Sequence, residues 1–157
     1  DAGVAKLRQE KVKVSTLIEN ALKPLIIPME IKDITYTVAG IEEILTCDLK
    51  WTTEAVINIL RNCIEHAPEH GKIEIAAKDN PIYFEIRISD NGPGIDKEDL
   101  PHIFTRFYRG KNVSPDSIGI GLAMARSIIK EQNGDIVVES REGKGTTFFI
   151  RLYKTVV

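Results

Sequence analysis

Cysteine is scarce in this chain, and long apolar runs are absent. The 157 residues contain only Cys47 and Cys63, and neither belongs to a C-x-x-C or Cys/His pattern. A disulfide framework and a zinc site of common spacing are therefore excluded, and both residues are expected to be buried free thiols in a reducing compartment. No apolar run approaches the roughly 20 residues of a membrane-spanning helix, and no signal-peptide pattern opens the chain.

An excess of charge of either sign is also absent, because basic and acidic residues are nearly equal in number. Lys plus Arg number 21 and Asp plus Glu number 23, which gives a formal net charge of -2 at pH 7. Such a balance argues against binding to nucleic acid or to an anionic membrane. Because 43% of the residues are hydrophobic and Gly (11) and Pro (7) are near background, the chain is neither disordered nor collagen-like. We expect one soluble domain with its own core.

Apolar residues at helical spacing predict three helices. The first begins at a capping-box pattern, Thr16-Leu-Ile-Glu19, and Pro24 and Pro28 limit it, so it should end before about Met29. The second has the clearest periodicity, and the third ends at a pair that is typical of C-caps. These two helices are expected over Trp51 to Ala67 and from about Ile118 to Asn133-Gly134.

Alternating polar and apolar residues predict the strands. They are expected over residues 11–14, 31–39, 44–47, 72–78, 82–89, 135–140 and 146–153. The segment 44–47 could pair with 31–39, and the last four strands read as two hairpins. This order favours an α+β two-layer sandwich, with a mixed, mainly antiparallel sheet of about five strands and three main helices on one face.

Six glycines form three G-x-G pairs at predicted junctions between elements. The pairs are Gly92/Gly94, Gly119/Gly121 and Gly143/Gly145. Glycine permits a positive φ and close approach of backbone N–H groups to a ligand, although a tight turn is the simpler interpretation of any single pair. The pair before the last helix would place free N–H groups and the positive helix end toward a phosphate. The spacing matches neither a P-loop nor a dinucleotide-binding fingerprint.

Three polar residues stand where they could bind a ligand. Asn58 and Asn62 lie one turn apart on the central predicted helix, away from its apolar stripe. Amide oxygens are suitable ligands for a Mg²⁺ ion that phosphate oxygens also hold. The alternative interpretation of the two asparagines is an ordinary solvated polar face of the helix. Asp90 ends a predicted strand, where its carboxylate could accept a hydrogen bond from an exocyclic amine such as that of adenine. The alternative for Asp90 is an ordinary turn residue.

Basic and aromatic residues gather after the first glycine pair. Arg106 and Arg109 alternate with Phe104, Phe107 and Tyr108 in a segment bounded by proline and glycine. The basic side chains could reach phosphate while the aromatic rings fix the segment to the domain. The alternative is a surface loop with an aromatic anchor.

Taken in order, these segments resemble the N, G1, F, G2 and G3 boxes of sensor histidine kinases. The matching segments are Asn58-x-x-x-Asn62, Asp90–Ile95, Ile103–Arg109, Gly119–Ala123 and Gly143–Phe148. The chain thus resembles the catalytic ATP-binding domain of a two-component sensor kinase, a member of the GHKL ATPases with the Bergerat fold. It departs from the usual pattern at Glu65, where a lysine is common, and at Ser117, where a glycine is common.

The resemblance implies a set of site residues. Asn62 and Arg109 would be catalytic, and Asn58 and Asn62 would bind Mg²⁺. Residues 96–118 would form the ATP lid. The nucleotide would contact Asn58, Asn62, His66, Asp90, Gly92, Gly94, Ile95, Tyr108, Arg109, Ser117, Gly119, Gly121, Leu122 and Thr146.

The resemblance also implies partners. The domain would donate the γ-phosphate of ATP to a histidine on a separate dimerisation domain, which then serves a response regulator. Residues 1–10 would be a linker remnant and 11–157 the catalytic domain, in the cytoplasm and without membrane contact of its own, in a parent protein that is membrane-anchored. Two alternatives are a GHKL serine kinase that acts as an anti-sigma factor and a degenerate domain that binds a protein partner.

Overall fold

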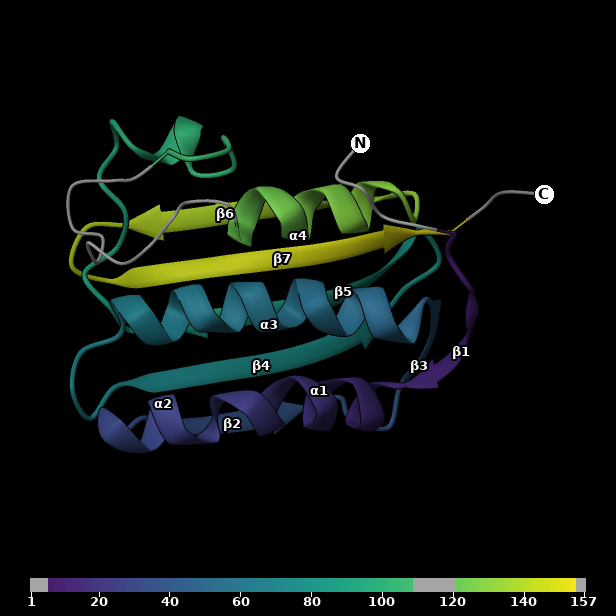
Figure 1. Ribbon diagram of the computed structural model, residues 1–157, viewed down its shortest axis with the longest axis horizontal. Helices are drawn as coiled ribbons and strands as arrows, with labels where there is room; N and C mark the ends of the chain where they lie inside the picture. The colour runs from purple at the N-terminus through teal and green to yellow at the C-terminus, as the bar shows by residue number, and fades with distance from the viewer. Residues whose placement is uncertain (1–5, 109–120, 155–157) are drawn as a thin grey trace.

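The computed structural model describes residues 6–108 and 121–154, and its helices cover one face of a sheet. Figure 1 shows α1, α3 and α4 in front of the five-stranded sheet. The helical segments are α1 (Val14–Leu22), η1 (Lys23–Leu25), α2 (Ile26–Ile31), α3 (Leu49–His66), η2 (Leu100–His102) and α4 (Gly121–Lys130). The strands are β1 (Glu10–Lys13), β2 (Thr35–Ala39), β3 (Ile44–Cys47), β4 (Lys72–Asp79), β5 (Tyr83–Asp90), β6 (Gly134–Arg141) and β7 (Gly145–Tyr153). The predicted two-layer sandwich is confirmed.

The main sheet is mixed, as predicted, with the strand order β2-β4-β5-β7-β6. Only β2 and β4 pair in parallel, and the other neighbours are antiparallel. Alternate residues of the central strands face the helices, so that Ile75, Ile88 and Phe148 are almost completely buried. From the opposite layer α3 contributes Ile59 and Leu60, both fully buried. The sheet and the helices therefore share one core.

The predicted start of the first helix is wrong, whereas its end at Leu22 falls before Met29 as predicted. The helix begins at Val14 without a side-chain cap, because the first backbone N–H groups donate to carbonyls of the turn before β3. Val14 N donates to Glu43 O at 3.0 Å, and Ser15 N donates to Ile41 O at 3.1 Å. A neighbouring turn satisfies the donors that a capping side chain would otherwise serve.

Helical structure also continues beyond the predicted limit at Met29. Pro24 and Pro28 each fall in the first turn of a new segment, η1 or α2, where a proline needs no N–H partner. The third segment reaches Ile31, so the predicted strand over 31–39 is shorter and begins at Thr35.

The pairing of the short strand β3 also differs from the prediction. It pairs antiparallel with β1 in a separate two-stranded sheet, with Val12 opposite Leu45. The strand β2 pairs with β4 instead. A parallel neighbour leaves no local turn signal in the sequence, because parallel strands are joined through distant connections.

The remaining predictions of elements are confirmed. The helix α3 ends at His66, and Ala67 already has the extended backbone that a following proline favours. Both hairpins form, and Asn133 adopts the left-handed conformation (φ 61°) that ends the α4 region. The predicted start of this helix, near Ile118, lies outside the described residues. Within residues 6–108 and 121–154, no helix is long and apolar enough to span a membrane.

Candidate functional site

The first and third glycine-rich segments meet at one end of the main sheet. In the ladders Asp90 at the end of β5 lies opposite Ile73 of β4 on one side and Thr146 of β7 on the other. The segment after β5 is fastened to the β6–β7 turn, since Gly143 N donates to Pro93 O at 2.7 Å. The first and third glycine pairs, predicted separately from sequence, are therefore brought together.

Gly94 shows why glycine is needed at this junction. Its φ is +83°, and a Cβ atom would lie 2.2 Å from the carbonyl oxygen of Arg141. The next residue, Ile95, donates its backbone N–H to Ser140 Oγ at 2.7 Å. Ser140 Oγ also lies 3.0 Å from Thr146 Oγ1, so the hydroxyl connects the two segments. Side-chain replacement at Gly94 would push these segments apart.

Asp90 is a buried carboxylate surrounded by hydrogen-bond donors. Asp90 is only 7% exposed, and its Oδ1 accepts a hydrogen bond from Gly92 N at 2.8 Å. Burial raises the pKa of Asp90, and this effect exceeds the opposing effects of hydrogen bonds from Gly92, Cys63 and Thr146 and of the nearby His66. A buried acid held in one orientation is suited to recognise a single donor group of a ligand.

The two asparagines of α3, Asn58 and Asn62, are half-buried. Asn58 lies against the start of α4, because a Cβ on Gly121 would be 3.6 Å from Asn58 Oδ1. Asn62 lies one turn further along α3. Asn58 and Gly121, which the resemblance assigns to one nucleotide, are therefore neighbours in the structure.

These residues fit a magnesium ion that arrives with a nucleotide. Within the described residues, no three His, Cys, Asp or Glu side chains form a cluster that could hold a metal ion by itself. Neutral amide oxygens beside the N-terminus of α4 are hard donors, and they leave the remaining ligand positions to phosphate oxygens and water. The donor set therefore favours Mg²⁺ with phosphate over a permanently bound metal.

The C-terminal end of α3 is held by a lysine from outside the helix. Lys32 Nζ donates to the carbonyls of Ile64 at 2.8 Å and Glu65 at 3.1 Å. A cation at this end satisfies free carbonyls and opposes the negative end of the helix dipole. His66, predicted to contact phosphate, is half-buried at this same end, where its charge would act on Asp90.

The first part of the predicted lid is anchored by aromatic side chains. Phe104 packs edge-on against Phe148 of the core, with ring centroids 6.5 Å apart, and Arg126 of α4 lies over its ring at 5.2 Å. Tyr108 donates its hydroxyl hydrogen bond to Asp99. Phe107, by contrast, is 68% exposed. The predicted aromatic anchor is therefore formed by Phe104, not by every ring of the segment.

Several predicted site residues lie outside the described part of the chain. They are Arg109, Ser117 and Gly119. Leu122 is described, on the first turn of α4, partly buried against the core. The structure thus describes the predicted lid segment, 96–118, only as far as residue 108.

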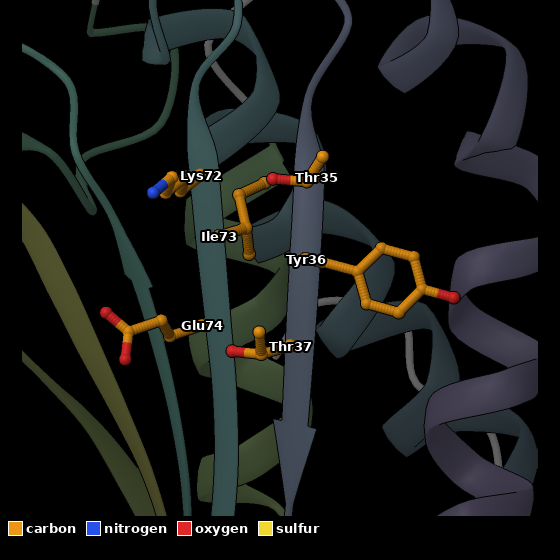
Figure 2. Close-up of a pocket in the computed structure, with 6 residues that line it drawn as sticks. All are labelled: Thr35, Tyr36, Thr37, Lys72, Ile73 and Glu74. Atoms are coloured by element: carbon orange, nitrogen blue, oxygen red, sulfur yellow. The ribbon is translucent and has the colours of Figure 1, made fainter.

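A hollow of about 420 Å³ lies elsewhere, along β2 and β4. Figure 2 shows its lining, in which Tyr36 points to one side of the strands and Glu74 to the other. It contains none of the predicted site residues. It lies on the edge strand β2, which is largely exposed, and on its neighbour β4, so we do not assign the nucleotide to it.

Two residues that sequence reasoning did not assign to the site belong to it. Cys63 is fully buried and is one of the groups that lower the pKa of Asp90, and Ser140 joins the two glycine-rich segments. A buried cysteine on an apolar helix stripe and a serine near a strand end are ordinary core and turn residues by pattern. Only the register that places β5 beside β7, with α3 above, reveals their neighbours.

Comparisons with known proteins point to one family. The family described as "Histidine kinase-, DNA gyrase B-, and HSP90-like ATPase" matches residues 47–156. Sensor histidine kinase YvrG of Bacillus subtilis (strain 168) is 33% identical over 109 residues, which cover 68% of this chain and 19% of that protein. Sensor protein kinase WalK of Staphylococcus aureus is 36% identical over 105 residues, covering 64% and 25%.

A solved structure gives the same indication. The catalytic domain of histidine kinase ThkA, in a nucleotide-free form, matches with a TM-score of 0.82 and 25% identity, over 96% of this chain and 100% of that domain. The present chain spans about a fifth to a quarter of the length of YvrG and WalK.

Proposed function

The chain belongs to the family of histidine kinase-, DNA gyrase B- and HSP90-like ATPases, and we propose that it binds Mg·ATP and positions the γ-phosphate for transfer to a histidine. The acceptor histidine would lie on a separate dimerisation domain. This proposal extends family membership, which implies an ATP site, to a particular reaction and a particular set of residues.

The buried carboxylate of Asp90 is the observation that carries the proposal. It stands at the end of β5, fixed by Gly92 N–H, between the Gly92/Gly94 segment and the C-terminal end of α3. An ionised carboxylate only accepts hydrogen bonds, so it selects a base that presents an amine and disfavours one that presents a carbonyl. Adenine presents that amine. Gly94, Ile95 and Thr146 would then border the base.

The phosphates are assigned to the other end of the site. Asn58 and Gly121 face each other there, and Asn62 lies on the same helix, so amide oxygens and the N–H end of α4 would meet the phosphates and Mg²⁺. When bound, Mg²⁺ would neutralise phosphate charge. Phosphoryl transfer depends mainly on such positioning and charge neutralisation, so this chain needs no nucleophile of its own. Arg109, Ser117 and Gly119 enter this assignment by resemblance alone.

The wider context is part of the proposal. The acceptor histidine and a membrane anchor would lie in sequence that the longer relatives have and this chain does not cover. A response regulator would be served through the acceptor domain. Residues 1–10 would connect the catalytic domain, 11–157, to the acceptor domain. Arg8 and Gln9 are bonded to the domain, through Asp48 and Gln132 respectively.

Calorimetric titration of the chain with ATP and a non-hydrolysable analogue, with and without Mg²⁺, tests the nucleotide site. We expect Mg-dependent binding that Asp90→Asn abolishes. Asn62→Ala should remove the Mg²⁺ dependence. No binding of ATP by the wild-type chain in the millimolar range would overturn the proposal.

The acceptor needs a separate experiment. Radiolabelled ATP is incubated with this chain and an added dimerisation domain, and the acid lability of the product is measured. Phosphohistidine is labile in acid whereas phosphoserine is stable, so the result separates the histidine kinase from the serine kinase. Binding without transfer to any acceptor would favour the degenerate domain.

A further inference from the structure

The C-terminal end of α3 is fixed by a turn that lies outside the nucleotide site. This turn, 32–35, follows α2, and it contacts the loop 67–71 between α3 and β4. Figure 1 shows the end of α2 and this loop on the same side of the molecule, at the left of the view. Lys32 is half-buried, and its Nζ donates to the carbonyl oxygens of Ile64 at 2.8 Å and Glu65 at 3.1 Å. One ammonium group thus satisfies two carbonyls that have no partner within the helix.

The turn itself is fastened to the loop by further hydrogen bonds. His70 N donates to the carbonyl oxygen of Lys32 at 2.8 Å, and Thr35 N donates to Gly71 O at 3.1 Å. The side chains of Asp33 and His70 meet, with Oδ2 and Nδ1 2.7 Å apart. Both residues adopt the left-handed conformation, with φ of 51° and 63°, which persists where surrounding contacts fix it. The position of Lys32 relative to α3 is therefore defined by its backbone as well as by its ammonium group.

The end of α3 in turn touches the segment that carries Asp90. A Cβ on Gly92 would lie 2.6 Å from the carbonyl oxygen of His66, the last residue of α3. Gly92 N is the donor that binds Asp90 Oδ1 at 2.8 Å. The next strand is attached to the same segment, since Lys72 N donates to Asn91 Oδ1 at 2.8 Å. A shift of the last turn of α3 would consequently move Gly92 and the hydrogen bond that orients the carboxylate.

We infer that Lys32 is a positioning residue, which fixes the last turn of α3 against the segment 90–92 and thereby maintains the preference for adenine. This inference rests on the proposed function, because it assumes that Asp90 contacts the base. Lys32 acts through the backbone of α3 and not by contact with the nucleotide. A lysine that only caps a helix would stabilise the fold and leave the preference among bases unchanged. The two roles therefore differ in a quantity that can be measured.

The experiment measures the affinities of the wild type, Lys32→Met and Lys32→Arg for ATP and for inosine triphosphate, which presents a carbonyl where ATP presents an amine. Lys32→Met keeps most of the aliphatic stem and removes the ammonium group. ATP binding should weaken by about 3- to 10-fold, as is typical of residues that act on a site through a network of contacts. Binding of inosine triphosphate should hardly change, so the ratio of the two affinities falls by the same factor. Lys32→Arg keeps the charge and the donors and should restore the ratio to within about twofold.

Lys154 provides a matched control. Its Nζ lies 2.7 Å from Asp79 Oδ1, and Asp79 is at the opposite end of β4 from Lys72. Lys154→Met removes a lysine contact of similar length far along the sheet from Asp90, and it should leave both affinities unchanged. Urea unfolding of each variant sets a temperature for the titrations at which the chain is folded.

An unchanged ratio in Lys32→Met, including equal weakening of both nucleotides, would overturn the positioning role and leave the ATP site intact. A ratio that arginine does not restore would overturn it as well. If the wild-type chain binds neither nucleotide, the proposed function fails, and this inference fails with it.

Discussion

At the scale of single residues, Asp90 combines a cost to folding with the role in binding that we propose for it. Its carboxylate is almost completely buried, and this burial raises its pKa despite the hydrogen-bond donors around it. Binding sites are often built from groups whose ionised form the fold does not favour. This predicts a specific dependence of stability on pH.

A group whose folded pKa is raised contributes most to stability below its unfolded pKa, here about 4, and loses that contribution as pH rises through the folded pKa. The free energy of unfolding of the wild type, minus that of Asp90→Asn, should therefore decrease between pH 4 and pH 7. Urea titrations at several pH values measure this difference. A difference that is constant or that increases with pH would contradict the raised pKa.

Asp135 is an internal control of opposite sign. Burial raises its pKa, but hydrogen bonds from Arg126 and from Ile136 N, with the charge of Arg126, outweigh this and leave the pKa lowered. A lowered folded pKa contributes stability above the unfolded pKa and loses it as pH falls through the folded pKa. The wild type minus Asp135→Asn difference should thus increase with pH below about pH 4.

Gly94 and Gly143 allow backbone conformation to be separated from steric contact. Both have positive φ, +83° and +77°, but only at Gly94 would a Cβ meet another atom, and no described atom lies within 4 Å of a Cβ at Gly143. Gly143→Ala should destabilise the fold by roughly 1–2 kcal/mol through conformation alone. Gly94→Ala should cost about 1–3 kcal/mol more. Urea unfolding of both variants checks the order, and equal losses would contradict it.

At the scale of elements, Gln132 connects segments that are far apart in sequence. It is a buried residue just after α4, and its Oε1 accepts from Asp48 N at 2.8 Å while its Nε2 donates to Thr52 Oγ1 at 2.9 Å. Gln9 donates to the same Oε1 at 3.2 Å. One side chain therefore joins α4 to the N-terminal end of α3 and to the segment before β1.

Removing this side chain should be costly. Gln132→Ala leaves the buried N–H of Asp48 and the hydroxyl of Thr52 without their partner, and a buried donor without a partner costs about 1–3 kcal/mol. We expect a loss of about 2–3 kcal/mol in the free energy of unfolding. The control is Gln9→Ala, an exposed residue in the same network, which should change stability by less than about 0.5 kcal/mol. Comparable losses in both variants would show that the buried contacts do not dominate.

The elements were predictable where local pattern decides their structure. The helix α3 has a 3.6-residue apolar period and its C-terminal proline, and each hairpin has alternation around a short turn. The start of α1 was not predictable, because carbonyls of the distant turn at Ile41 and Glu43 cap the helix. The partner of β3 was not predictable either, because β1 pairs with it in place of the expected β2. Tertiary contacts overrode the local signal in both cases.

At the scale of the whole molecule, the site is assembled from both layers. Asp90 and Thr146 come from the sheet, and Cys63, Asn58 and Gly121 come from helices. The polar residues and glycines were visible in the sequence because they break the apolar pattern. The buried thiol of Cys63 follows that pattern, so its effect on the pKa of Asp90 could be seen only from the register of β5 and the packing of α3 on it.

A ligand that bridges the two layers should stabilise the entire fold. At a concentration of 100 times its dissociation constant, a ligand that binds only the folded state adds about 2.7 kcal/mol. For a chain of this size that corresponds to an increase in melting temperature of roughly 5–11 °C. We expect this increase with Mg·ATP in a thermal unfolding experiment, much less with GTP at the same concentration, and none in Asp90→Asn. An equal increase with GTP, or one that persists in Asp90→Asn, would show that the nucleotide binds without contact between its base and this carboxylate.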